Sequence, residues 1–123
     1  MDDEGHEYSV EVAGDTLLVW QRGAPDSLAQ LGRFQDELSR AREETSARRA
    51  LFDNRETTMP PDEIRDAMLA WVCEAGRFDA IAVVLQSEML AVRLNMDAIA
   101  QRVRMRAFDS VPAARKWLVD GKT

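Results

Sequence analysis

The sequence contains few of the residues that build disulfides, metal sites and many catalytic centres. It has one cysteine and one histidine in 123 residues. A lone cysteine has no partner within the chain for a disulfide, which favours a reducing compartment. One histidine and one cysteine are also too few for a zinc site, which usually takes four such ligands or three and a water. We therefore expect a cytoplasmic protein that holds no metal or other cofactor.

Long apolar runs and an excess of basic residues are missing as well. No run approaches the ~20 residues of a membrane span, and the acidic start of the sequence lacks the basic and then apolar order of a signal peptide. Sixteen basic side chains stand against 22 acidic ones, which gives a net charge of −6. Nucleic-acid-binding domains usually carry a basic excess. The sequence thus predicts neither membrane insertion nor a nucleic-acid partner.

One uninterrupted apolar run is present, Ile-Ala-Val-Val-Leu at residues 81–85. A strand with one wet face alternates apolar and polar residues, so a continuous run predicts a strand that is covered on both faces. Such cover requires helices on two sides of a sheet. We expect this strand, at residues 80–86, to lie at the centre of a layered α/β domain.

Further strands are predicted on both sides of this run. Two β-prone segments, residues 8–12 and 16–20, are joined at Gly14-Asp15. They predict a hairpin, because glycine adopts the positive φ that a tight turn needs. Short strands are also expected at residues 50–53 and 104–108, with a polar loop from residue 54 to residue 59.

Four helices follow from apolar residues at helical spacing and from capping residues. The first helix runs from a cap at Asp26 or Ser27 to about residue 46. The second starts at Pro61 and ends near Gly76, and the third starts after Ser87. A short fourth helix follows Ser110. Met68, Trp71 and Trp117 are predicted to be core residues.

The predicted architecture is therefore a mixed sheet of about five strands with four helices, in which an opening hairpin precedes alternating helices and strands. Residues 7–120 are expected to form a single domain. Residues 1–6, which include the single histidine, His6, are expected to be an acidic disordered tail.

Three stretches of the sequence point to a known family. They are the hairpin with Gly14-Asp15 followed by residues 17–20, the strand end Leu51-Phe-Asp53 leading into a helix, and residues 106–118, where a strand ending in Phe-Asp precedes a helix closing on Trp-Leu. In these stretches and in the order of its elements the chain resembles the STAS fold of sulfate-transporter and anti-sigma-factor-antagonist domains. The resemblance is strongest to the SpoIIAA-like subgroup of bacterial proteins.

This resemblance implies a small, non-catalytic regulatory domain that binds another protein or a second copy of itself. In the antagonist branch, a serine in an Asp-Ser-Ser-Gly-like stretch after the third strand is phosphorylated to break the partner interface. The matching residues 54–62 contain no serine or glycine, and their hydroxyls, Thr57 and Thr58, do not match the motif. The phosphoswitch is therefore not transferred. Some relatives by fold hold lipid-like ligands, so binding of a small apolar ligand is the alternative function.

The second helix, the loop before it and the third helix are predicted to present the partner surface. Loops at the carboxyl ends of strands gather function in open α/β sheets. In the third helix, methionines lie off the face formed by Leu90 and Leu94, and flexible thioethers suit adaptable contacts. The residues predicted for this surface are Thr57, Thr58, Met59, Ser87, Met89, Val92 and Met96.

Three arginines alternate with apolar residues near the end of the chain. Arg102, Arg104 and Arg106 would share one face of a strand. One interpretation is a patch that binds an anionic partner. The other is an outer strand whose charges discourage edge-to-edge pairing.

Catalytic chemistry has little support in the sequence. Cys73 follows Val72 in the second helix and is predicted to be a small buried or half-buried thiol whose pKa the neighbouring Glu74 would raise. Asp53 and Asp109 each follow a phenylalanine at a strand end and would share one rim if the strands run parallel. Capping and hydration of loops are the plainer roles for such aspartates, so we expect no enzyme.

Overall fold

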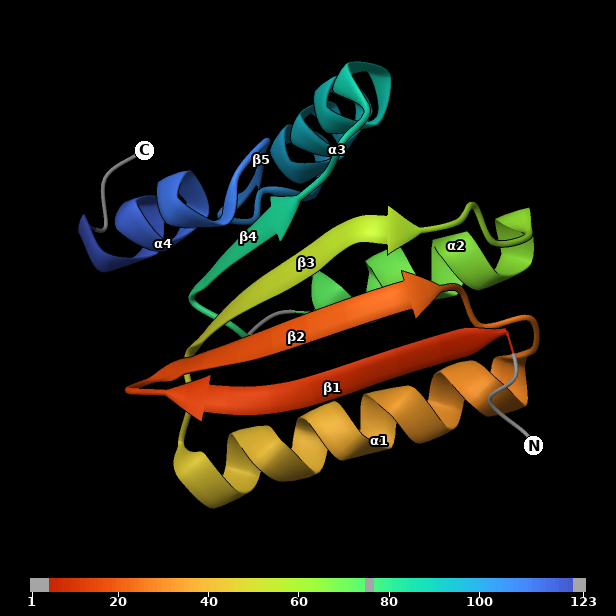
Figure 1. Cartoon of the computed structure of the whole chain (residues 1–123), viewed down its shortest axis with the longest axis horizontal. Coiled ribbons are helices and arrows are strands. Elements are labelled where there is room, and N and C mark those ends of the chain that lie inside the picture. The colour runs from red at the N-terminus through yellow and green to blue at the C-terminus, as the bar shows by residue number, and fades with distance from the viewer. Residues whose placement is uncertain (1–4, 75–76, 121–123) are drawn as a thin grey trace.

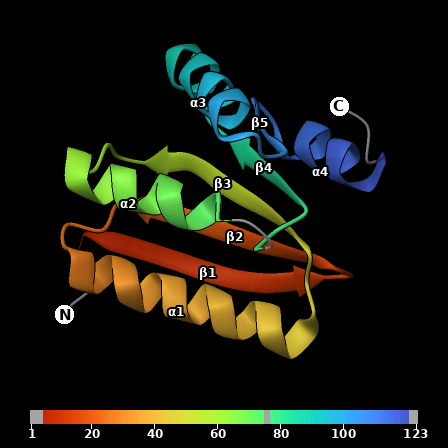
Figure 2. The same cartoon turned by 180° about the vertical axis from the view of Figure 1, so that it is seen from behind.

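The computed structural model describes residues 5–74 and 77–120, and in that part of the chain five strands form one sheet with four helices around it (Figures 1 and 2). The sheet order is β1-β2-β3-β4-β5. The strands are β1 (His6–Ala13), β2 (Thr16–Gly23), β3 (Arg49–Thr57), β4 (Ala80–Val84) and β5 (Met105–Phe108). The helices are α1 (Leu28–Thr45), α2 (Asp62–Val72), α3 (Glu88–Gln101) and α4 (Val111–Asp120).

The sheet is mixed, as predicted. β1 and β2 pair antiparallel, and the remaining neighbours pair in parallel. The hairpin turns at Gly14-Asp15, where Gly14 has a φ of 63°. An L side chain at Gly14 would be strained in this conformation, whereas glycine adopts it readily.

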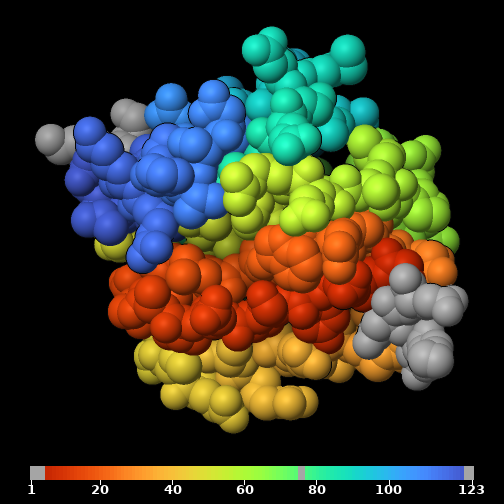
Figure 3. All heavy atoms as spheres, viewed as in Figure 1, coloured from red at the N-terminus to blue at the C-terminus, as the bar shows by residue number. Residues whose placement is uncertain are grey.

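The helices are distributed unequally over the two faces because strand order and chain order coincide. α1, α2 and α3 each connect neighbouring parallel strands, always in the same direction across the sheet. Right-handed crossovers in one direction place all three helices on the same face. α4 follows the last strand and covers the other face, over β3, β4 and β5. The outer face of the β1–β2 hairpin is left at the surface (Figure 3).

The apolar run at residues 81–85 forms most of β4, and all five residues of this strand are buried. Ile81 and Val83 pack into the core on the face of the sheet that α1, α2 and α3 cover. Ala82 and Val84 pack with Trp117 and its neighbours on α4. The prediction of a strand covered on both faces is confirmed. Its central position was wrong: the hairpin adds two strands beyond β3, which leaves β3 in the middle and β4 beside the β5 edge.

β3 is longer than the sequence predicted. It continues through the first four residues of the expected polar loop and ends at Thr57. β4 pairs with β3 only as far as Asp53. β2 follows β3 further, with Arg22 opposite Glu56 and Gly23 opposite Thr57. The polar end of β3 therefore extends beyond β4 and is supported on one side only.

His6 corrects the predicted tail, because it is the first residue of β1. Its side chain is 2% exposed, and its Nε2 lies 2.8 Å from Oε1 of Gln21. Its ring packs edge-on against Phe34 of α1, with 5.0 Å between centroids. The start of the tail, residues 1–4, and the expected end of the second helix at Gly76 lie outside the described residues.

Candidate functional site

α2 does not close tightly onto the sheet. Ile64 is the only one of its eleven residues that is buried, whereas Met68, Trp71 and Val72 are half-buried. Between these side chains, the sheet and the neighbouring helices lies a pocket of about 360 Å³. Met68 and Trp71, predicted as core residues, pack against the core and also line this pocket, while Trp117 on α4 is buried as expected.

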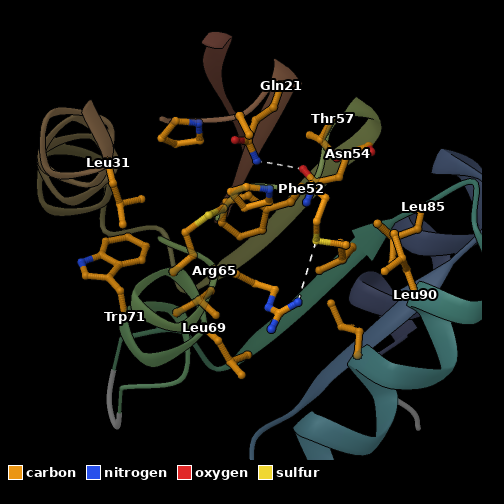
Figure 4. A pocket seen from close by; sticks show the side chains of 18 of the residues that line it. Gln21, Leu31, Phe52, Asn54, Thr57, Arg65, Leu69, Trp71, Leu85 and Leu90 are labelled. Carbon is orange, nitrogen blue, oxygen red and sulfur yellow. Dashed lines mark hydrogen bonds between the residues drawn. The ribbon is translucent and has the colours of Figure 1, made fainter. Parts of the chain in front are cut away.

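Most of the pocket wall is apolar (Figure 4). Figure 4 shows α1 and α2 contributing on one side and the end of β4 and the start of α3 on the other. The floor is the apolar face of β3 and β4. The main apolar residues of the wall are Leu31, Phe52, Leu69, Trp71, Leu85 and Leu90. Such a wall favours the apolar part of a ligand over water.

A chain of two side-chain hydrogen bonds, the first of them buried, reaches the pocket from β1. His6 Nε2 contacts Gln21 Oε1, and Gln21 Nε2 donates to Asn54 Oδ1 at 2.8 Å. Gln21 and Asn54 both line the pocket. The Asn54 side-chain oxygen accepts this hydrogen bond, and the amide nitrogen of the same side chain can donate to a bound molecule. The Thr57 hydroxyl donates to the Asn54 carbonyl at 2.8 Å, which fixes the end of β3 beside the pocket.

Charged side chains from α2 and α3 border the same pocket. The Arg65 guanidinium pairs with Asp62 at 3.3 Å and approaches the Met59 sulfur at 4.0 Å, and in Figure 4 it lies between the two apolar sides. Arg93 on α3 is exposed, and in the described part of the chain it has no ion-pair partner. The charged residues of the lining are Arg65, Asp66, Arg93 and Asp97. The Arg65 guanidinium can bind an anionic group at the edge of an apolar pocket.

Cys73 caps the carboxyl end of α2 next to pocket-lining Val72. It is half-buried, as predicted. Burial, and after it the Asp97 carboxylate, raises the pKa of the Cys73 thiol above its ordinary value. The acid responsible is Asp97 on α3, which is distant in sequence, and not the neighbouring Glu74. A thiol with a raised pKa stays protonated at neutral pH and is a poor nucleophile.

The two predicted rim aspartates lie at the same end of the parallel strands, with β4 between them. Asp53 is aligned with the last residue of β4, and Asp109 directly follows β5. The Asp53 carboxylate accepts two hydrogen bonds from the Arg55 guanidinium, at 2.8 and 2.7 Å. These bonds hold the pKa of Asp53 below its ordinary value. Within residues 5–74 and 77–120, no group of three histidines, cysteines or acids could hold a metal ion.

The predicted partner surface divides into two separate parts. Thr57, Thr58 and Met59 line the pocket described above. Thr57 is half-buried at the end of β3, and Thr58 and Met59 are exposed. These three residues therefore belong to this pocket, together with Gln21 and Arg65, which the sequence did not single out.

The other part lies on the outer side of α3. Met89, Val92 and Met96 have exposed fractions of 81%, 58% and 64%. Ile99 is 79% exposed and joins them. Ser87 caps the helix with its side-chain oxygen. The spacing of residues 89, 92, 96 and 99 is the sequence signal that would have identified the fourth member.

The three arginines do not share one strand face. Arg102 ends α3 in the left-handed conformation, with a φ of 58°. Arg104 precedes β5 and lies 5.4 Å from the Trp117 ring centroid, and Arg106 in β5 lies 5.5 Å from that of Phe108. The prediction is wrong for Arg102 because α3 continues to residue 101 and β5 starts only at Met105. β5 is an outer strand, which agrees with the second interpretation.

Comparisons with known proteins identify the fold. No family model matches the chain, and no curated protein is significantly similar to it. A solved structure is similar, that of an uncharacterized protein of the DUF3478 family with a SpoIIAA-like fold from Shewanella loihica PV-4. The two share 17% identity with a TM-score of 0.69, over 93% of this chain and 94% of the other. The chain has a SpoIIAA-like fold.

The SpoIIAA-like fold confirms the resemblance that the sequence predicted, including the STAS-like arrangement of strands and helices. At this level of identity the likeness concerns architecture alone. No helix in the described part of the chain is long and apolar enough to span a membrane.

Proposed function

We propose that this protein binds a small amphiphilic molecule, with an apolar body and an acidic end, in the pocket beside α2. The observation that carries this proposal is the pocket itself. Its volume of about 360 Å³ falls within the range of ligand pockets, roughly 300–1,000 Å³. Such pockets combine an apolar wall with a few converging polar groups, and this one has both.

The apolar body would lie between Leu69 on α2 and Leu90 on α3, over Phe52 of the sheet. Burying each methylene group there is worth about 0.8 kcal/mol. The acidic end would accept hydrogen bonds from the Arg65 guanidinium and the Asn54 amide. Charge-assisted hydrogen bonds of this kind are stronger than neutral ones.

The proposed role is non-catalytic. The Cys73 thiol has a raised pKa, and the Asp53 carboxylate is engaged by Arg55. These properties suit neither a nucleophile nor a free general base. We place the protein in the cytosol because its single cysteine forms no internal disulfide.

Native mass spectrometry of protein purified from its own host provides the first test, and an added small-molecule mass is expected. Titration with straight-chain carboxylates of increasing length, followed by calorimetry, gives the second. Each added methylene should tighten binding about fourfold until the pocket is full. Arg65→Gln should weaken the binding of carboxylates but leave the binding of alcohols of the same length unaffected.

A matched pair on α3 controls for unfolding. Leu90 lines the pocket, and its neighbour Met89 is 81% exposed on the outer side. Leu90→Glu should abolish carboxylate binding, while Met89→Glu should leave it unchanged. Wild-type affinity in a folded Leu90→Glu variant would refute the proposed pocket.

A second candidate role is regulation through binding of another protein. The exposed apolar residues on the outer side of α3 favour this role, since large apolar patches on soluble proteins often mark interaction sites. Affinity capture with wild type and with a variant carrying Met89→Glu and Met96→Glu tests it. Recovery of the same partners by both proteins would exclude this side of α3 as the contact surface.

A further inference from the structure

Four apolar side chains form a continuous band on the outer side of α3, which we call the α3 stripe: Met89, Val92, Met96 and Ile99. Their exposed fractions range from 58% to 81%. They are half of the eight large apolar residues that are exposed in the described part of the chain. One helix of 14 residues therefore carries an unusual share of exposed apolar surface.

The stripe lies opposite the side of α3 that packs on the sheet. Ala98 is buried in the core and Leu94 packs against the same cluster. At 3.6 residues per turn, the four stripe residues project to the other side of the helix. Their separations of three, four and three residues are those of the a and d positions of a coiled coil. This spacing suits pairing with another helix.

The charged residues beside the α3 stripe indicate which helix pairs with it. Glu88 precedes the first a position and Arg93 follows the first d position, so they occupy g and e positions. In a parallel pair, a g residue of one copy lies beside the e residue five positions later on the other copy. Glu88 of each copy would then face Arg93 of the other. Neither side chain has an ion-pair partner among the residues that the structure describes.

An antiparallel pair of α3 helices lacks this complementarity. It would bring the two copies of Arg93 together near the symmetry axis, and like charges at such positions repel. We infer that this protein forms a homodimer in which the α3 stripes of two copies pair in parallel. The inference rests on the second candidate role and names its partner as a second copy of this chain.

Sedimentation over a wide range of protein concentration tests the inference. Wild type should shift from monomer to dimer as its concentration rises, because a single helix seam is small beside stable interfaces of about 1,200–2,000 Å². Val92→Glu should remain monomeric. Val119→Glu is the control, since Val119 is 76% exposed on α4, away from the stripe, and it should dimerise like wild type. Circular dichroism verifies that each variant is folded.

Charge exchange and cross-linking test the orientation. Glu88→Arg should weaken dimerisation about fivefold, and adding Arg93→Glu should restore it. In a Cys73→Ser background, Met89→Cys should form a disulfide-linked dimer on oxidation, because the two copies of residue 89 adjoin in a parallel pair. In an antiparallel pair they lie about 15 Å apart, a distance that a disulfide cannot bridge.

A wild type that stays monomeric at every concentration overturns the inference. So does a dimer that Val92→Glu leaves intact, or one that Met89→Cys fails to cross-link. A monomer that still captures a different protein through the α3 stripe also overturns it, although the second candidate role would then stand.

Discussion

α1 and α3 start alike and cover the same face of the sheet, but they use their apolar residues differently. Both helices begin at a serine whose side chain accepts a backbone hydrogen bond. α1 buries Leu31, Phe34 and Leu38. α3 buries Ala98 alone and exposes the whole α3 stripe.

The apolar residues of α1 therefore contribute to the stability of the fold, whereas those of the α3 stripe contribute to its exposed surface. A buried large apolar side chain stabilises the fold by about 1.5–3 kcal/mol, so α1 anchors the first half of the sheet. The α3 stripe contributes almost nothing of this kind in a single chain, because its side chains remain in water. α3 instead presents two apolar sides, one toward the pocket and one outward.

The largest predicted effect concerns the buried side of α1. Phe34 is 3% exposed and packs against His6 and Tyr8, with centroids 5.0 and 4.7 Å away. Phe34→Ala should lower the free energy of unfolding by about 3–5 kcal/mol, because it leaves a cavity in the core. In the monomer, Met96→Ala on α3 should change it by less than about 0.5 kcal/mol, since Met96 is 64% exposed. Urea denaturation measures the free energy of unfolding of both variants. Equal losses would contradict the difference between the two helices.

A smaller effect is expected where α3 itself meets the core. Ala98 is 3% exposed, so Ala98→Leu should overpack the site and cost about 1–3 kcal/mol. Ala100→Leu, at an exposed position of the same helix, serves as the matched control and should stay within about 0.5 kcal/mol of wild type. Comparable unfolding midpoints in denaturant for the two variants would show that α3 is not anchored through Ala98.

Removal of the serine cap should destabilise the protein by a similar amount in α1 and in α3. Ser27 accepts a hydrogen bond from the backbone of Gln30 at 3.1 Å, and Ser87 accepts one from Leu90 at 3.2 Å. Ser27→Ala and Ser87→Ala should each cost about 1 kcal/mol in thermal or chemical unfolding, and aspartate at either position should restore most of it. An unchanged free energy of unfolding in Ser87→Ala would mean that the hydrogen bond of Ser87 does not stabilise the start of α3.

The smallest effect is a shift in the titration of Cys73. Burial and then Asp97 raise the pKa of its thiol. Removing the negative charge stabilises the thiolate, so Asp97→Asn should lower the pKa while the contribution of burial remains. Asp36→Asn, on the exposed side of α1, should not change it. The pH dependence of alkylation by iodoacetamide reports this single thiol, and an unchanged profile in Asp97→Asn would contradict the proximity of α3 to Cys73.

Features encoded by neighbouring residues could be predicted from the sequence. The continuous run of β4 and the Gly14-Asp15 hairpin carry their structure locally, as do the serine caps at Ser27 and Ser87. Each depends on one periodicity or one backbone conformation. The fold class followed from these signals.

Features set by distant residues could not be predicted. The sequence predicts a loop at the end of β3 because Asn54 and the residues after it are polar. Pairing with β2 makes this segment a strand. His6 reads as part of an acidic tail, yet Gln21 and Phe34 hold it in the core. The pocket arises because α2 leaves space above the sheet, so Trp71 packs against the core and also forms a wall of the pocket.

The order of the strands has a consequence for synthesis of the chain. Each strand pairs with its neighbours in sequence, so the sheet can grow from β1 to β5 as the chain leaves the ribosome, and no early strand waits for a late one. α4 comes last and alone covers the second face. Until it docks, a nascent chain exposes Ala82 and Val84 on that face. Docking of this ten-residue helix therefore removes the apolar face of β4 from water.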